Sequence, residues 1–196
     1  MMNYLVFILV LIANVVSAQH GAGLKPLEIG SDAPSFEAKN QEDKLIKSKD
    51  LLEKGAVVLV FYRGTWCPYC QKHVHELQEG LKQIVDKGAS VVVVTPEKPE
   101  YIDKMVSKSG ATFSILHDEG YKIMEAYNTK YTVKAEDKMA FKSYVVSHTK
   151  KNNGDDEAVL PVPATYVIGK DGKVKFVHFE TNYKQRSTIE MILEAL

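Results

Sequence analysis

The sequence predicts a single α/β domain built around a mixed β-sheet. Two near-continuous runs of β-branched and aromatic residues, 56–62 and 90–95, fit strands that are buried on both faces, and a helical pattern follows each run. Near the end of the chain, two strand-like runs flank a Lys-Asp-Gly-Lys turn at residues 170–173, which is typical of a tight hairpin. Parallel strands joined by helices and followed by a hairpin produce a sheet with both strand directions.

Glycine and proline mark the elements of the first half. Residues 31–55 predict short strands, polar turns and a brief helix that ends at Gly55. Pro68 fits the first turn of the next helix, where its missing N–H has no partner to lose, and Gly88 ends that helix. A third helix is framed by two prolines and closed by Gly110.

The second half begins with a short strand at residues 113–116 and a short helix at residues 118–128. Residues 132–160 mix a helix, a strand and a polar loop, and they show no clear period. After the hairpin, the chain ends in a helix with an apolar stripe, for which Ser187 and Glu190 predict a capping box.

The first 18 residues predict a secretory signal peptide. They carry no charged side chain, include an apolar run too short for a comfortable membrane span, and end in a Val-Ser-Ala cleavage pattern. The alternative is an N-terminal anchor that is not cleaved. We therefore expect a linker at residues 19–30, a domain at residues 31–196, and a periplasmic or secreted location, where disulfides persist.

Composition narrows the range of functions. The 25 basic and 25 acidic residues cancel, so no electrostatic argument favours nucleic acid or an anionic membrane as a partner. A domain of this size buries enough apolar surface to fold without disulfides. The two cysteines, Cys67 and Cys70, are therefore free for chemistry, and we expect no cofactor or metal.

Both cysteines lie in the stretch FYRGTWCPYC, residues 61–70, where a strand passes through a short loop into a helix. The free N–H groups and the dipole of the first helical turn favour a thiolate, so the pKa of Cys67 should fall and make it a nucleophile. We expect Cys67 to be exposed and Cys70 to lie beneath it, within reach of a disulfide. Arg63 can add positive charge near the sulfur.

Two alternatives for the cysteine pair stay open. A structural disulfide would close a loop too short to constrain the unfolded chain much. A zinc site would add His73 and His75, but zinc fingers separate their ligand pairs by about a dozen residues, and we interpret both histidines as solvated. Haem attachment is excluded because Gln71, and not histidine, follows the second cysteine. Trp66 is expected to anchor the loop and to screen the sulfur of Cys67.

Four segments in order resemble the alkyl hydroperoxide reductase / thiol-specific antioxidant family of the thioredoxin superfamily, in its peroxiredoxin-like branch. These segments are IGSDAPSFEAKN, VLVFYRGTWCPYCQKHVHEL, LPVPATYVIGKDGKVKFVHF and TNYKQRSTIEMILEAL. The match runs from about residue 27 to the C-terminus. The resemblance implies a thioredoxin-like fold, in which helices flank a central mixed sheet.

The resemblance also implies roles for individual residues. Cys67 matches the peroxidatic cysteine, whose thiolate attacks a peroxide and becomes a sulfenic acid, and Cys70 would then form a disulfide with it. An external thiol donor, such as a thioredoxin-like protein, would reduce that disulfide. Pro163 matches a proline that is cis in the thioredoxin fold and that meets the cysteines across the active site.

The sequence departs from the peroxiredoxin pattern at the activating groups. Gly64 stands where those enzymes carry threonine or serine, and Thr65 comes one residue later. Their late-strand arginine is matched by Pro163. Thr65 and Arg63 are therefore candidates to replace the missing groups. The Cys-Pro-Tyr-Cys sequence is also that of glutaredoxins, which favours thiol–disulfide exchange.

Three functions remain in competition. The first is an antioxidant peroxidase that reduces hydroperoxides through Cys67, with Cys70 resolving. The second is an extracytoplasmic thiol–disulfide oxidoreductase that acts on protein disulfides. The third is a thioredoxin fold that binds a metal or a partner without catalysis. For Tyr183 and Arg186 we favour a structural turn before the last helix over a role near the cysteines. The sequence predicts neither the oligomeric state nor the electron donor.

Overall fold

The computed structural model describes residues 23–137 and 142–196. The predicted signal peptide and the first part of the predicted linker lie outside these ranges. The last residues of that linker are part of the folded body, because Leu27 packs against the core and the Gly30 N–H donates to the Val174 carbonyl at 2.8 Å. Within the described ranges, no helix has the length and apolar character needed to cross a membrane.

A five-stranded mixed sheet with the order β5-β4-β3-β8-β9 forms the centre of the molecule. β3 (Ala56–Phe61), β4 (Ala89–Thr95) and β5 (Ser114–His117) are parallel. β8 (Ala164–Ile168) and β9 (Val174–Phe179) form the predicted hairpin, and β8 pairs with β3 in the antiparallel direction. The predicted α/β domain with a mixed sheet is confirmed.

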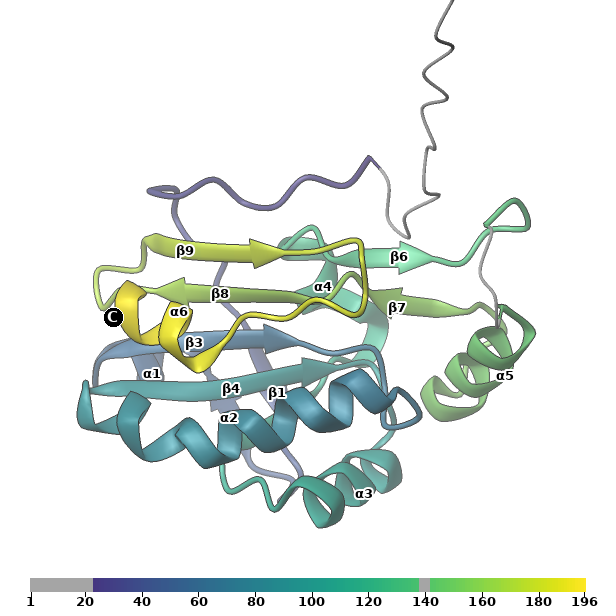
Figure 1. Cartoon of the computed structure of the whole chain (residues 1–196), viewed down its shortest axis with the longest axis horizontal. Coiled ribbons are helices and arrows are strands. Elements are labelled where there is room, and N and C mark those ends of the chain that lie inside the picture. The colour runs from purple at the N-terminus through teal and green to yellow at the C-terminus, as the bar shows by residue number, and fades with distance from the viewer. Residues whose placement is uncertain (1–22, 138–141) are drawn as a thin grey trace, which may run out of the picture.

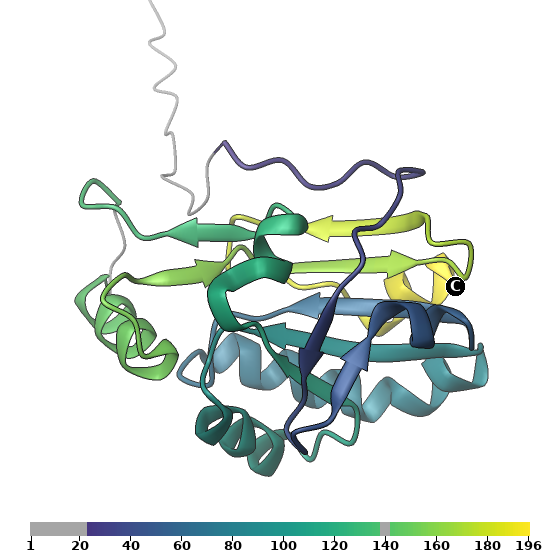
Figure 2. The same cartoon turned by 180° about the vertical axis from the view of Figure 1, so that it is seen from behind.

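Helices cover both faces of this sheet (Figure 1, Figure 2). One face carries α2 (Pro68–Asp86), α3 (Pro99–Ser109) and α6 (Ile189–Ala195). The opposite face carries the following elements: α1 (Ser48–Leu52), the 3-10 turn η1 (Glu119–Tyr121), α4 (Lys122–Ala126), and the ribbon of β1 (Glu37–Lys39) and β2 (Leu45–Lys47).

The part of the chain without a clear sequence period forms three elements at one end of the sheet. β6 (Lys130–Thr132) pairs with β7 (Val159–Pro161), and α5 (Lys142–Asn153) lies beside the loop that joins β3 to α2 (Figure 1). Only Val145, Thr149 and Asn152 are buried in α5. The helix therefore lacks the continuous apolar stripe that would have revealed it in the sequence.

Alternation along β3 divides the core into two clusters. Both clusters are built on β3 residues with no exposed surface, since the strand is buried on both sides as its β-branched run predicted. The cluster on the α2 side contains Val58, Val60 and Tyr62, which directly follows the strand, and the cluster on the α4 side contains Val57, Leu59 and Phe61. The α2-side cluster also contains both cysteines.

The last helix begins one residue later than predicted. Its N-cap is Thr188, whose Oγ1 accepts a hydrogen bond from the Met191 N–H at 3.3 Å. The Ser187 hydroxyl is buried and donates to Thr165 Oγ1 on β8 at 2.8 Å. The predicted Ser187 capping box is therefore wrong, because this side chain is used in packing the helix lead-in against the sheet.

Candidate functional site

The loop between β3 and α2 brings the cysteine motif to the carboxyl edge of the parallel strands, where open α/β sheets bind their ligands. Cys67 is the N-cap of α2 and Pro68 is its first residue, as predicted. The N–H groups of Cys70 and Gln71 donate to the Cys67 carbonyl at 3.0 and 3.1 Å. The two cysteines therefore share the first helical turn.

Both thiols are reduced and buried. Cys67 is 2% exposed and Cys70 is 0% exposed. The prediction of an exposed Cys67 is wrong, because Trp66 packs against the cluster that contains both cysteines, and the Trp66 ring in turn meets the Tyr144 ring of α5 at 6.2 Å. A substrate needs movement of these side chains to reach Cys67.

The two sulfurs share one proton. Burial works to raise the pKa of Cys70, but the hydrogen bond from the Cys67 thiol and the charges of Arg186 and Arg63 lower that pKa to about 5. The same hydrogen bond, together with burial, raises the pKa of Cys67. The pair therefore loses its first proton well below the usual thiol pKa, and the two sulfurs share the resulting negative charge. The proton must move to Cys70 before Cys67 can attack.

Arg63 and Arg186 supply the positive charge at the thiols. Arg186 Nη2 lies 3.6 Å from Cys70 Sγ. Arg63 is 2% exposed, and its guanidinium lies 4.6 Å from the centre of the Tyr183 ring and 5.1 Å from that of Trp66. Burial lowers the pKa of Arg63, whereas the nearby cysteines raise it. Arg63 therefore lies where the sequence suggested, close to both sulfurs.

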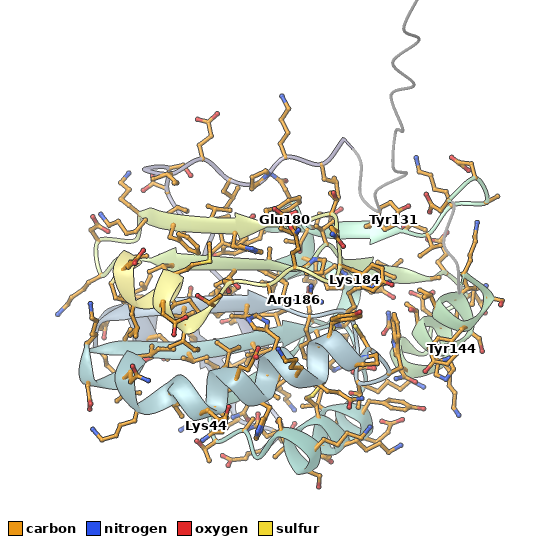
Figure 3. The ribbon with its side chains drawn as sticks, in the orientation of Figure 1. Lys44, Tyr131, Tyr144, Glu180, Lys184 and Arg186 are labelled. Atoms are coloured by element: carbon orange, nitrogen blue, oxygen red, sulfur yellow. The ribbon has the colours of Figure 1, made fainter. Side chains whose placement is uncertain are left out.

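The segment between β9 and α6 carries Arg186 (Figure 3), and this segment brings the guanidinium to Cys70. Arg186 does close a turn, because its Nη1 donates to the Tyr183 and Gln185 carbonyls. The same turn places Tyr183 against Arg63 and against the ring of Tyr69, 5.7 Å away. The interpretation of this segment as a structural turn alone is therefore wrong.

Thr65 is hydrogen-bonded to the carboxyl group of Glu97, a residue that the sequence did not indicate. Its N–H and its Oγ1 lie 2.7 and 2.6 Å from Glu97 Oε2, and the Asn152 amide donates to Glu97 Oε1 at 2.5 Å. Glu97 is fully buried, which raises its pKa. Its position just after β4, at the same sheet edge as the cysteine loop, is the signal that could have revealed it.

The two histidines of α2 face different surroundings. His73 is buried, contrary to its interpretation as solvated, and its Nε2 lies 3.5 Å from Ser187 Oγ. Burial, with the charges of Arg186 and His178, lowers its pKa to about 3, so it is neutral. His75 is exposed, as predicted. Within the described ranges, no cluster of three or more histidine, cysteine or acidic side chains is arranged to hold a metal.

Pro163 lies immediately before β8, at the same edge of the sheet as the cysteine loop. All peptide bonds in the described ranges are trans, so the predicted cis Val162–Pro163 bond is wrong. Trans is the intrinsically preferred form by about 0.5–1 kcal/mol. In this geometry the Val162 N–H donates to the Thr129 carbonyl at 2.7 Å, and the Pro163 carbonyl accepts from the Glu180 N–H at 3.1 Å.

Several buried N–H groups around the thiols have no partner within the protein. Unpaired buried donors are costly and uncommon, so a group of them at one place is a mark of a binding site. Four such atoms are Arg63 Nε, Arg63 Nη2, Trp66 Nε1 and Arg186 Nε, and beside them His73 Nδ1 is a buried nitrogen without a partner.

Comparison with known proteins agrees with this dithiol centre. Residues 29–177 match the model of the AhpC/TSA family. The chain belongs to the AhpC/TSA family. It is similar to the thiol-disulfide oxidoreductase ResA of Bacillus anthracis, with 27% identity over 154 residues, which cover 78% of this chain and 70% of the relative. It is also similar to the putative peroxiredoxin bcp of Haemophilus influenzae, with 25% identity over 104 residues, 53% of this chain and 66% of the relative.

Solved structures share the fold of this AhpC/TSA protein. The peroxidoxin BcpB from Mycobacterium tuberculosis has a TM-score of 0.65 at 19% identity, covering 86% of this chain and 96% of that one. A mutant of PrxQ from Xylella fastidiosa has a TM-score of 0.67 at 15% identity, covering 87% and 95%. The predicted peroxiredoxin-like membership and thioredoxin-like fold are confirmed, and the protein is an oxidoreductase.

Proposed function

We propose that the protein reduces hydroperoxides through Cys67 and that Cys70 converts the oxidised sulfur to a disulfide. The observation that carries this proposal is the hydrogen-bonded sulfur pair next to Arg63, whose Nε and Nη2 have no protein partner. Peroxide oxygens can accept hydrogen bonds from these two groups. Such bonds strengthen as negative charge develops on the departing oxygen.

The proton shared by the two sulfurs is the one that the leaving alkoxide takes up. The Cys67 proton moves to Cys70, the Cys67 thiolate attacks one peroxide oxygen, and the O–O bond breaks. The departing alkoxide takes a proton from the Cys70 thiol and leaves as an alcohol. The Cys70 thiolate then attacks the sulfenic sulfur of Cys67 and expels hydroxide, which becomes water. An external thiol donor returns the two electrons.

Thiol–disulfide exchange with protein disulfides is the second candidate. The Thr65 hydroxyl, which the sequence offered as a replacement for the usual threonine, is held by Glu97. Exchange needs only a dithiol with one low pKa, which the cysteine pair has. The similarity to ResA supports this candidate.

Stopped-flow fluorescence of Trp66, the single tryptophan, separates the two candidates. Reduced protein is mixed with hydrogen peroxide or with a disulfide-bonded protein, with Cys67→Ser as the control. We expect a fast change that depends on peroxide concentration and is absent in the control. A peroxide rate equal to that of an ordinary thiolate, together with a mixed disulfide trapped by Cys70→Ser, would instead establish exchange.

Export remains a proposal based on the apolar leader at residues 1–18. A periplasmic or secreted location would suit a protein whose working cycle includes a disulfide. Mass spectrometry of the protein recovered from its own cells tests this directly, because a cleaved leader leaves a chain that begins at Gln19. An intact Met1 terminus on soluble cytoplasmic protein would exclude it.

A further inference from the structure

Two guanidinium groups lie at the cysteine pair without a carboxylate partner. The salt bridges among the described residues do not include Arg63 or Arg186. The two cations are close enough for Arg186 to act on the charge of Arg63. Arg63 is almost fully buried, so solvent offers its charge little relief.

The shared thiolate is the counter-ion of these cations in the reduced protein. Arg186 Nη2 reaches Cys70 Sγ at 3.6 Å, and the charge of each cysteine acts on Arg63. A disulfide carries no charge, so oxidation removes this counter-ion while both cations stay. The rings of Trp66 and Tyr183 face Arg63 and offset only part of the cost of an unpaired buried cation.

We propose that Arg63 and Arg186 form an anion site that fills when the cysteines are oxidised, and that its ligand is the carboxylate of a small thiol reductant. Three guanidinium N–H groups have no partner within the protein and can donate to it: Arg63 Nε, Arg63 Nη2 and Arg186 Nε. Guanidinium groups match the geometry of a carboxylate through paired hydrogen bonds. Arg186 is partly exposed on the segment between β9 and α6, so the anion approaches from that side (Figure 3).

The site couples binding of the reductant to its reaction. The reductant thiolate attacks Cys67 Sγ, the Cys67–Cys70 bond breaks, and Cys70 leaves as a thiolate beside Arg186. A second thiol then attacks the reductant sulfur of the mixed disulfide, which releases Cys67 and forms the oxidised reductant. Two thiols thus give two electrons to the two cysteines, which keep one proton between them, and the second proton goes to solvent. The restored Cys70 thiolate replaces the carboxylate at Arg186, which promotes release of the product.

This inference rests on the proposed function only in requiring a disulfide cycle, which both candidate functions share. Its test therefore starts from protein oxidised by a chemical oxidant and uses no peroxide. Three thiols of similar size and different charge act as reductants: 3-mercaptopropionate, 2-mercaptoethanol and cysteamine. Each rate is divided by the rate of the same thiol with a neutral small disulfide, at constant ionic strength, so that intrinsic thiol reactivity cancels.

We expect 3-mercaptopropionate to reduce the protein at least about tenfold faster than 2-mercaptoethanol after this correction, with cysteamine the slowest. Arg63→Gln and Arg186→Gln should each lower that preference, and the double variant should abolish it. Lys184→Gln removes an exposed charge two residues from Arg186 and should leave the preference intact. Equal corrected rates in the unaltered protein, or equal loss of preference in Lys184→Gln, would overturn the proposal.

A competition experiment on the unaltered protein does not depend on how the variants fold. Added propionate, which carries the carboxylate without a thiol, should slow reduction by 3-mercaptopropionate and should slow reduction by 2-mercaptoethanol much less. Uniform slowing of both thiols would contradict a carboxylate site. A slow reaction with peroxide would reject the peroxidase proposal without changing either result.

Discussion

Each face of the central sheet carries a cluster of buried residues, but the polar groups of the two faces differ in their hydrogen bonding. On the α4 face, the Tyr127 hydroxyl donates to the Pro34 carbonyl at 2.7 Å, and the Tyr166 hydroxyl donates to the Tyr127 carbonyl at 2.9 Å. On the α2 face, buried N–H groups without a protein partner belong to Arg63, Trp66 and Arg186.

The hydrogen bonding of buried polar groups distinguishes the face that only packs from the face that contains the reactive thiols. A buried side chain that acts only in packing has its polar atoms hydrogen-bonded, because an unpaired buried polar atom lowers stability and contributes nothing to function. Unpaired groups persist where a substrate or a changing charge completes them, and apart from Thr149 Oγ1 and Asn153 Oδ1 on α5, those among the described residues lie around the thiols. One face of the sheet is a completed core, whereas the other has its polar groups arranged for a reaction.

The largest expected effect comes from breaking the completed core. Tyr127→Ala should lower the free energy of unfolding by about 3–5 kcal/mol, because the ring is fully buried and packs against Phe61 and Tyr166. The pH at which the cysteines titrate should not change. Urea unfolding and thiol alkylation against pH measure the two quantities, and a shifted thiol titration would show that the faces are not independent.

Removing one hydroxyl from each face sharpens the comparison. Thr65→Val deletes a hydrogen bond to the buried Glu97 carboxyl and should cost about 1.5–3 kcal/mol, whereas Tyr127→Phe deletes a bond to a neutral carbonyl and should cost about 0.5–1.5 kcal/mol. Both substitutions preserve shape. Urea unfolding of the two variants side by side decides the question, and equal costs would mean that the bond to the Glu97 carboxyl is no stronger than a bond to a neutral carbonyl.

The pH dependence of stability should differ between the reduced and oxidised proteins. The pKa of Cys70 is about 5 in the folded state, below the value of about 8.5 for a free thiol. Between these values the unfolded chain binds a proton that the folded chain lacks, so stability rises with pH. The contribution is complete above the unfolded pKa and disappears as pH falls through the folded pKa.

This contribution amounts to at most about 1.4 kcal/mol per pH unit for one proton. The oxidised protein has no thiol and should lack it, whereas the low pKa of His73, about 3, affects both forms. Urea unfolding of both forms at pH 6, 7 and 8 isolates the thiol term as the difference between their slopes. Equal pH dependence of the unfolding free energy in the two forms would mean that folding does not lower the pKa of a cysteine.

The smallest effect is expected at a position on the α2 face that takes no part in the chemistry. Thr188→Ala removes the N-cap of α6 and should cost about 1 kcal/mol, while Thr188→Ser keeps the capping oxygen and should cost less. Thermal unfolding measures both. The rate of thiol oxidation should stay unchanged in each variant, and a slower rate would connect the α6 cap to the site through Arg186.

Local patterns were enough to place much of the fold. The run at residues 56–62 could be a strand because β-branched side chains suit a pleated, doubly buried surface, and Pro68 and Gly110 delimit helices through backbone geometry alone. The sequence indicated a helix within residues 132–160 but not its bounds, because two of the three buried residues of α5, Thr149 and Asn152, are polar and give no apolar stripe. Ser187 misled the capping prediction because its hydroxyl binds Thr165, 22 residues away in sequence.

The sequence by itself determined the fold class, the redox pair and its place at a helix start, because these depend on neighbours within a few residues. Only the tertiary structure decided which cations lie beside the sulfurs and how far solvent reaches them. Arg186 lies 116 residues from Cys70 in sequence, and Glu97 lies 32 residues from Thr65, yet each is in contact. Charge and burial depend on distance in space, and no local pattern encodes that distance.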